Sequence, residues 1–244
     1  MKKQGLFFKF LKKIVKIFYK TPEFSGGDNL GDEPVIIVGN HAQLHGPIIT
    51  EAYMPNNTYV WVIGEMLSVK KFPAYAYEDF WRFKPKWIKW FYKGFSYAIA
   101  PLASYIFNNA KGIGVYKDIR IANTLKNTVL RLKEGNNVVI FPEKRESYNN
   151  IINEFQKNFV DVARVYYKAT GKEISFVPTY IAPKIKKVVY GKPIKFNSTV
   201  DYKEEKERIV NKLKEEITSL AKELPTHKVV PYENLKKKDY PYSK

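Results

Sequence analysis

Short apolar runs, each ended by glycine, proline or polar residues, recur along this chain and predict buried β-strands. Between them, apolar residues return every three or four positions, which is the period of a helix packed on one face. Strands that alternate with helices indicate an α/β sheet covered by helices on both faces. The predicted strands cover about residues 35–38, 59–63, 113–116, 138–141, 174–177, 187–190 and 193–196, and the predicted helices cover 72–107 (as one or two helices), 121–132, 155–168 and 203–223.

The start of the chain has a different pattern. Residues 6–20 combine lysines with aromatic and aliphatic residues so that, on a helix, the lysines fall opposite the apolar side chains. Seven lysines and no acidic residue precede Thr21. We therefore predict that residues 1–22 form an amphipathic helix lying on an anionic membrane surface. The alternative is a helix packed on its own domain with its lysines in solvent.

Charge and aromatic content narrow the class of partner. The chain has 42 Lys and Arg against 24 Asp and Glu, a formal net charge of +18. Such a charge attracts an anionic membrane, small phosphorylated molecules or nucleic acid. An aromatic content of 16% suits a membrane interface as well as base stacking. No nucleic-acid-binding signature accompanies the charge, so nucleic acid is not expected as a partner.

The domain organisation follows from the absence of any linker-like tract in 244 residues. We predict one α/β domain over residues 23–225, preceded by the amphipathic helix and followed by a basic C-terminal tail over residues 226–244. Within this tail, residues 234–244 are predicted to be a solvated extension, with membrane or partner contact as the lesser alternative. The longest uncharged run, residues 94–110, is 17 residues with Pro101 inside, which falls short of a membrane span. The chain has no cysteine, which excludes disulfides and thiolate chemistry.

Candidate chemistry begins at the first buried strand of the domain. Residues 35–38 are apolar, Gly39-Asn40 end the run, and His41 follows at once. Pro47 can occupy the first turn of the next helix, where a missing N–H costs nothing. This arrangement holds an imidazole at the edge of a sheet beside a helix N-terminus. On these features alone, a loop with two solvated histidines, His41 and His45, is an equal alternative.

Three further motifs follow His41 in a fixed order. They are Gly112-Ile113-Gly114-Val115-Tyr116-Lys117, then Val139-Ile140-Phe141-Pro142-Glu143, then Phe176-Val177-Pro178 at the end of a strand. In this order and spacing, the set resembles the glycerolipid acyltransferase family, typified by 1-acylglycerol-3-phosphate O-acyltransferases. The resemblance covers about residues 34–196 and implies a mixed, largely parallel sheet.

The resemblance also implies an activity. His41 would act as general base on an acceptor hydroxyl, with Glu143 as a second catalytic residue. A fatty acyl group would pass from a thioester, acyl-CoA or acyl carrier protein, to a phosphorylated glycerol-type acceptor such as lysophosphatidate. No cofactor beyond this donor is expected. No metal site is expected either, because His41 and His45 lack a third ligand. The protein would be peripheral, on the cytoplasmic face of the membrane.

The sequence departs from the family pattern at three positions. The aspartate that follows the catalytic histidine in the family's His-x4-Asp motif, and that orients its ring, is replaced by Gly46. Lys117 stands where the family has a phosphate-binding arginine, with Arg120 one turn on, and Glu146 replaces another family arginine. The candidate substrate-binding residues are Asn40, Gln43, His45, Lys117, Arg120, Lys144 and Arg145, although for Lys117, Lys144 and Arg145 a solvated charged rim is an equal alternative.

Two hypotheses explain these departures. In the first, the protein is a variant acyltransferase in which another residue orients His41, the candidates being His45, Glu143, Asp79 and Asp118. In the second, it binds an anionic lipid or a phosphorylated ligand without transferring an acyl group. The retention of Asn40, His41, Pro142 and Glu143 favours the enzyme.

Overall fold

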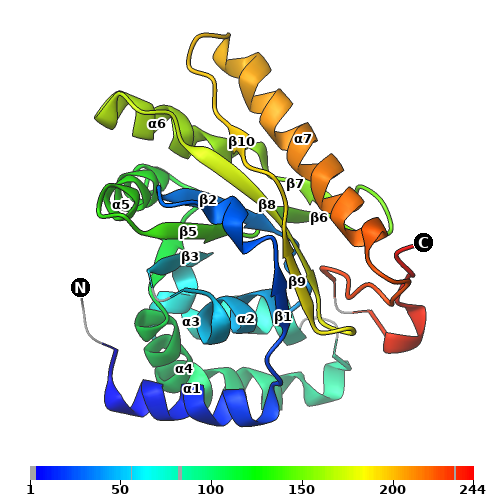
Figure 1. Ribbon diagram of the computed structural model, residues 1–244. Helices are drawn as coiled ribbons and strands as arrows, with labels where there is room; N and C mark the ends of the chain where they lie inside the picture. Colours follow the sequence, from blue (N-terminus) through cyan, green and yellow to red (C-terminus); the bar gives the residue numbers. More distant parts are fainter. Residues whose placement is uncertain (1–3, 56, 82–83, 234) are drawn as a thin grey trace.

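A mixed β-sheet forms the centre of the protein, which we describe from a computed structural model (Figure 1). The strand order is β1-β9-β8-β2-β5-β3-β4, with β10 paired to β8. Strands β8, β2, β5, β3 and β4 are mutually parallel, whereas β9 and β10 run antiparallel to β8. The predicted α/β class with a mixed, largely parallel sheet is therefore confirmed.

The structure describes residues 4–55, 57–81, 84–233 and 235–244. The strands are β1 (Glu23–Ser25), β2 (Val35–Gly39), β3 (Thr58–Ile63), β4 (Gly112–Val115), β5 (Asn137–Ile140), β8 (Ser175–Ala182), β9 (Lys187–Tyr190) and β10 (Ile194–Lys195), with a separate pair, β6 (Glu143–Ser147) and β7 (Asn153–Phe155).

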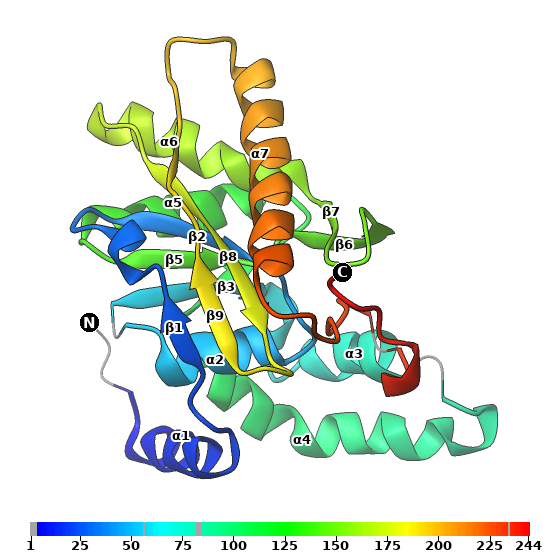
Figure 2. The ribbon, with the colours of Figure 1, turned by 45° about the vertical axis from the view of Figure 1, so that its right-hand side comes forward.

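Helices cover both faces of the sheet (Figures 1 and 2). Helices α5, α6 and α7 pack on one face, and α2 packs on the other. Beyond α2 lie α1 and α4, which form an outer layer, and α3, at the level of α2, packs on α4. The helices are α1 (Leu6–Phe18), α2 (His45–Tyr53), α3 (Phe72–Ala76), α4 (Lys89–Asn109), α5 (Ile121–Lys133), α6 (Asp161–Thr170) and α7 (Tyr202–Glu223). Among the described residues, no helix combines the length and apolarity needed to cross a membrane.

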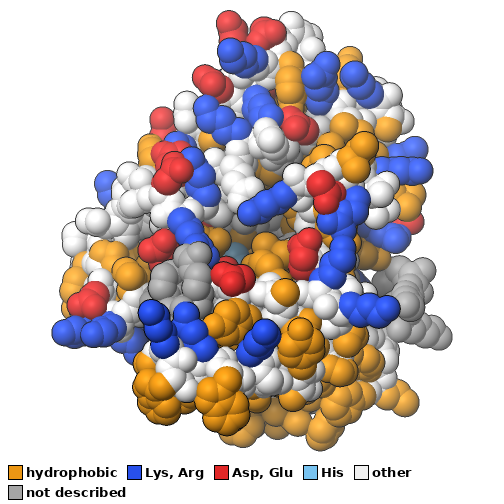
Figure 3. Space-filling view, turned by 180° about the vertical axis from the view of Figure 1, so that it is seen from behind, with side chains coloured by type: hydrophobic (Ala, Val, Ile, Leu, Met, Phe, Trp, Pro, Cys, Tyr) orange, Lys and Arg blue, Asp and Glu red, His pale blue; other side chains and the backbone are white. Residues whose placement is uncertain are grey.

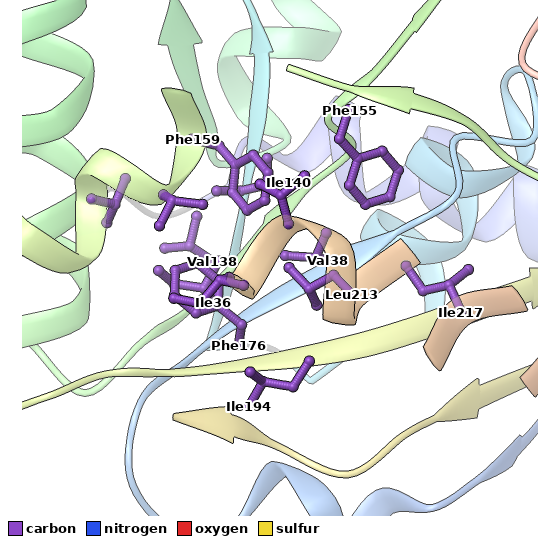
Figure 4. Packing of buried hydrophobic residues seen from close by; sticks show 14 of the residues in the cluster. Ile36, Val38, Val138, Ile140, Phe155, Phe159, Phe176, Ile194, Leu213 and Ile217 are labelled. Atoms are coloured by element: carbon purple, nitrogen blue, oxygen red, sulfur yellow. The ribbon is translucent and has the colours of Figure 1, made fainter. Parts of the chain in front are cut away.

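The central strand β2 shows why the first apolar run is continuous. All five of its residues are buried, because helices cover both faces of the sheet. Ile36 and Val38 point to the α7 side, where they join a cluster with Leu213 (Figure 4). Ile37 points the other way and packs with Ile49 of α2. Because successive side chains of a strand point to opposite faces, the residues of this one apolar run pack alternately into the hydrophobic cores on the two sides of the sheet.

Two predicted helices differ from the observed elements. The region 72–107 forms the short helix α3, a π-helical turn at Tyr77–Trp81 and then α4. Pro85 separates them, because the residue before a proline disfavours helical geometry. The helix expected from residue 155 begins at Asp161, because Phe155 pairs in β7 with Glu143 of β6.

The C-terminal segment, residues 226–244, packs on the domain at several points, although its lysines at 236–238 are exposed. His227, Val229, Val230, Tyr240 and Ser243 are all buried. The segment turns back on itself, pairing Lys228 with Tyr242 in an antiparallel bridge. Figure 2 shows it lying near α3 and the β6–β7 pair. The sequence predicts a solvated extension over residues 234–244: residues 235–239 are exposed, Asn234 lies outside the described residues, and the prediction is wrong at the buried Tyr240 and Ser243.

Candidate active site

The site lies where two adjacent parallel strands end. Strands β2 and β5 are paired with Val38 opposite Ile140, so the residues that follow them meet at the same edge of the sheet. Glu143 accepts a hydrogen bond from the backbone N–H of His41 through Oε2 at 2.5 Å. Its other oxygen, Oε1, accepts from the backbone N–H of Asn153 at 2.9 Å. Two motifs about a hundred residues apart in sequence thus make direct contact.

Glu143 is buried in this position, with 3% of its surface exposed. Burial raises the pKa of its carboxyl to about 7, although the N–H groups of His41 and Asn153 favour the charged form. Both carboxyl oxygens are bonded to backbone N–H groups and neither to the His41 ring. The geometry therefore gives Glu143 a role in holding the loop that carries His41.

The loop after β2 is held in a strained backbone conformation. Ala42 and Gln43 have φ angles of 46° and 56°, in the left-handed region that costs a non-glycine residue about 1–3 kcal/mol. Asn40 secures the start of the loop, since its side chain donates to the Ile181 carbonyl at 3.0 Å and accepts from the Ile181 N–H at 2.7 Å. The amide of Asn40, which we expected to bind substrate, is thus buried and bonded to β8.

The His41 ring lies between two aromatic rings. Phe141 packs against it at 5.3 Å between centroids, and Tyr232 at 5.6 Å, both in edge geometry. Nδ1 of His41 is buried, and none of the described residues makes a hydrogen bond to it. Burial lowers the pKa of His41, whereas the backbone of Gln43 and the charge of Asp79 act in the opposite direction. The imidazole is therefore neutral at pH 7, which is the form a general base requires.

Gly46 lies in the first turn of α2, close to the His41 loop. A Cβ atom built on Gly46 would lie 2.7 Å from the carbonyl oxygen of His41 and 3.0 Å from the ring of Phe141. Any side chain there would require the loop or the ring to move. The close approach of α2 to the His41 loop thus depends on glycine at this position.

All four residues considered as orienting partners for His41 have other partners, and Asp79 is paired with Arg145. Nδ1 of His45 shares a hydrogen bond of 2.6 Å with the hydroxyl of Tyr19, and the Asp118 carboxylate is paired with Arg120. Glu143 binds the backbone of His41, as described above. The charge of Asp79, in the π-helical turn Tyr77–Trp81, favours the imidazolium form of His41, as the backbone of Gln43 also does.

The candidate phosphate-binding residues form two separate groups. Lys117 is exposed beyond β4, three strand spacings or about 14 Å from β2. Its neighbour Arg120 is paired with Asp118 at 2.6 Å and stacks on Tyr116. Lys144 and Arg145 lie on β6, immediately after Glu143, and are paired with Glu146 and Asp79 respectively. Of these groups, the structure brings the second close to the His41 loop.

Sequence reasoning missed the contribution of the C-terminal segment to this site. Tyr232 contacts the His41 ring, and Gln43 donates from Nε2 to the Glu233 carbonyl at 3.1 Å and to the Tyr240 hydroxyl at 3.0 Å. Gln43, expected to bind substrate, thus binds this segment. A signal was present in Val229-Val230-Pro231-Tyr232, an apolar run inside an otherwise basic tail.

A second surface lies on the outer layer, where α1 and α4 run along the bottom of the molecule (Figures 1 and 2). Figure 3 shows hydrophobic side chains gathered along this edge, with lysines and arginines bordering them. The most exposed are Leu6 at 85% and Phe18 at 84%. Phe7 of α1 packs against Tyr105 of α4 at 5.8 Å, so the two helices share one surface. We call it the α1–α4 face; it comprises Leu6, Phe7, Phe10, Ile17, Phe18, Trp87, Trp90, Phe91, Phe95, Tyr97 and Leu102.

Comparison with known proteins returns little at the level of sequence. No family model matches the chain, and no curated protein matches it either. Among solved structures, the chain is similar to the 1-acyl-sn-glycerophosphate (LPA) acyltransferase PlsC from Thermotoga maritima, with a TM-score of 0.47 and 17% sequence identity. The similarity covers 85% of this chain and 77% of that one.

Proposed function

We propose that the protein is a membrane-peripheral O-acyltransferase that transfers a fatty acyl group from a thioester to the hydroxyl of a phosphorylated glycerol-type acceptor. The observation that carries this proposal is the contact between the His41 loop and Glu143 at the edge of the parallel sheet. The two motifs most characteristic of the resemblance, Asn40-His41 and Phe141-Pro142-Glu143, come together there around one neutral imidazole.

In the proposed reaction, His41 removes the proton of the acceptor hydroxyl as its oxygen attacks the thioester carbonyl carbon. The new C–O bond forms, the C–S bond breaks, and the proton passes from the imidazolium to the departing thiolate. The charge of Asp79 favours the imidazolium formed in this step. Acyl-CoA or acyl carrier protein would supply the thioester.

We further propose that the α1–α4 face rests on an anionic membrane. It places aromatic and aliphatic side chains at the depth of the headgroups, with basic side chains at its border, as in-plane membrane helices do. The membrane-bound alternative for the N-terminal helix is favoured, because Phe8 is the only residue of α1 buried among the described residues. In this arrangement Lys117, Arg120, Lys144 and Arg145 are the candidates for the acceptor phosphate, and the paired ones would exchange a carboxylate for it.

The test is turnover by wild type and His41→Ala, with acyl-CoA and acyl carrier protein donors and lysophosphatidate in mixed vesicles. We expect wild-type turnover and a loss of at least about 10²-fold in the variant, the smaller contribution of a general base. His45→Ala is the matched control, because His45 bonds to Tyr19 and lies outside the reacting groups proposed here. Absence of turnover by wild type across a panel of acceptors would contradict the proposal that the protein is an acyltransferase.

The alternative is a binder of anionic lipid that transfers no acyl group. Gly46 favours it, because the position that orients the base in the family holds no side chain and Nδ1 of His41 is left without a hydrogen bond among the described residues. Co-sedimentation with anionic vesicles separates the two functions. A protein that binds vesicles, equally well with and without His41, and never turns over would support the binder.

A further inference from the structure

The proposed base needs something to fix its ring, and position 46 does not supply it. The space beside Gly46 is filled by the carbonyl of His41 and the ring of Phe141. Nδ1 of His41, the atom that an orienting carboxylate would engage, has no hydrogen bond within the described part of the chain. The groups that the structure places against the His41 ring are the backbone of Gln43 and two aromatic rings, Phe141 and Tyr232.

The ionisable groups around the ring do not take over the task. Glu143 binds the backbone N–H of His41. Asp79 pairs with Arg145 at 3.3 Å and bonds to the hydroxyl of Tyr75, so it acts on the ring by its charge.

We propose that the C-terminal segment, residues 226–244, completes the site, with Tyr232 positioning the His41 imidazole in place of a side chain at position 46. The inference rests on the proposed role of His41 as base. The planes of the two rings are at 86°, an edge arrangement that aromatic pairs prefer and that restricts rotation of the imidazole. Phe141 meets the same imidazole at 66°, so the ring is held between them.

Tyr232 can hold His41 only if its own segment is fixed, and the structure fixes it on both sides. Before it, Val230 is 3% exposed and packs with Ala42 and Tyr240. After it, Gln43 bonds to the Glu233 carbonyl and to Tyr240. The anchors at Ala42 and Gln43 are the residues next to His41, so the segment and the loop are joined at the point of contact.

A second set of contacts closes the segment on itself and on the sheet. The Val229 N–H donates to the Pro241 carbonyl at 2.8 Å, and Ser243 lies against His227. Nε2 of His227 shares a hydrogen bond of 2.9 Å with the hydroxyl of Tyr180 on β8. The third histidine of the chain is thus a buried anchor for the segment that carries Tyr232.

The test compares Tyr232→Ala with Tyr232→Phe and with a matched control, Tyr242→Ala. Tyr242 is in the same segment but is 54% exposed, and it contacts Lys228 through a backbone bridge and through the lysine over its ring. The first readout is the titration of His41 by NMR of its ring, without substrate, assigned with a His41→Gln variant. We expect Tyr232→Ala to raise the pKa of His41 towards its ordinary value, because the ring gains solvent, while the other two variants leave it unchanged.

The second readout is turnover under the conditions used for His41. Tyr232→Ala should lower kcat by about 10–100-fold with KM little changed, because a misplaced base costs rate rather than binding. Tyr232→Phe keeps the ring and should stay within about threefold of wild type. An unchanged His41 titration in Tyr232→Ala would overturn the inference. Faster turnover in Tyr232→Ala would overturn it too, because the segment would then be a cover that obstructs the site. If wild type shows no turnover, the proposed function fails, and the titration still decides the role of Tyr232.

Discussion

The two ends of the chain have similar compositions and opposite relations to the α/β domain. Both are rich in lysine and aromatic residues. Helix α1 buries only Phe8 and exposes most of its apolar side chains on the α1–α4 face. The C-terminal segment instead buries Val229, Val230 and Tyr240. Composition therefore does not decide whether a basic terminal segment packs on its domain.

What separates them is the arrangement of the apolar residues. In α1 they recur along one helical face for 13 residues, and only Phe8 is buried, while Lys12 pairs with Glu51 of the domain. In the C-terminal segment they occur in short groups next to prolines, and Val230 and Tyr240 from two of these groups pack with Ala42 of the domain. A continuous amphipathic stripe fits a continuous surface such as a membrane, whereas short apolar groups fit a folded domain.

The difference in packing between the two ends can be tested by placing a charge at one apolar residue of each end and measuring folding stability. Val230→Asp should lower the free energy of unfolding by at least about 3 kcal/mol, since it buries an unpaired carboxylate beside Ala42 and Tyr240. Ile17→Asp, on the exposed face of α1, should change it by less than about 0.5 kcal/mol. Urea unfolding of the two variants checks this. Equal losses would mean that both ends are packed alike.

The folding stability should also depend on pH through the buried Glu143, which lies close to the C-terminal segment. Tyr180, which bonds to His227 of the segment, has its pKa raised in part by the charge of Glu143. The folded protein keeps the Glu143 proton up to about pH 7, whereas an unfolded chain releases it near pH 4.5. Between these values the folded state binds more protons, so stability falls as pH rises.

The predicted size of that effect is roughly 3 kcal/mol for a shift from 4.5 to about 7. Glu143→Gln removes the titrating group while keeping an oxygen for one backbone N–H. Between pH 4.5 and pH 7.5, the wild type should therefore lose about that much more stability than the variant, measured by urea unfolding at each pH. Parallel curves for the two proteins would show that Glu143 stays ionised in the fold.

The sequence predicts the domain better than it predicts the site. Apolar runs such as that of β2 locate strands because burial on both faces leaves no polar position, and this is visible residue by residue. The contact of His41 with Glu143 follows from parallel strands ending together. The contact between the rings of Tyr232 and His41 could not be predicted, because the two residues are nearly two hundred positions apart and meet only when the C-terminal segment folds back onto the domain. The engagement of Asn40 and Gln43 within the protein depends on the same tertiary contacts.

The smallest expected effect concerns the α1–α4 face and tests whether the exposed apolar residues of α1 bind a membrane, unlike those of the C-terminal segment. Phe18→Ser removes one of the most exposed aromatic side chains of α1. If this face rests on anionic lipid, the variant loses about 1.5–3 kcal/mol of apolar burial, or at least about tenfold in vesicle affinity, with no loss of folding stability. Tyr242→Ser is the matched control, an exposed aromatic residue of the C-terminal segment outside the face. Co-sedimentation with anionic and with neutral vesicles measures the binding of both variants.

Raised salt should weaken wild-type binding to anionic vesicles only, because salt screens the attraction between the basic side chains at the border of the face and the anionic lipid. Equal binding by Phe18→Ser and wild type would show that α1 does not reach the membrane, and the apolar stripe of α1 would then need another partner.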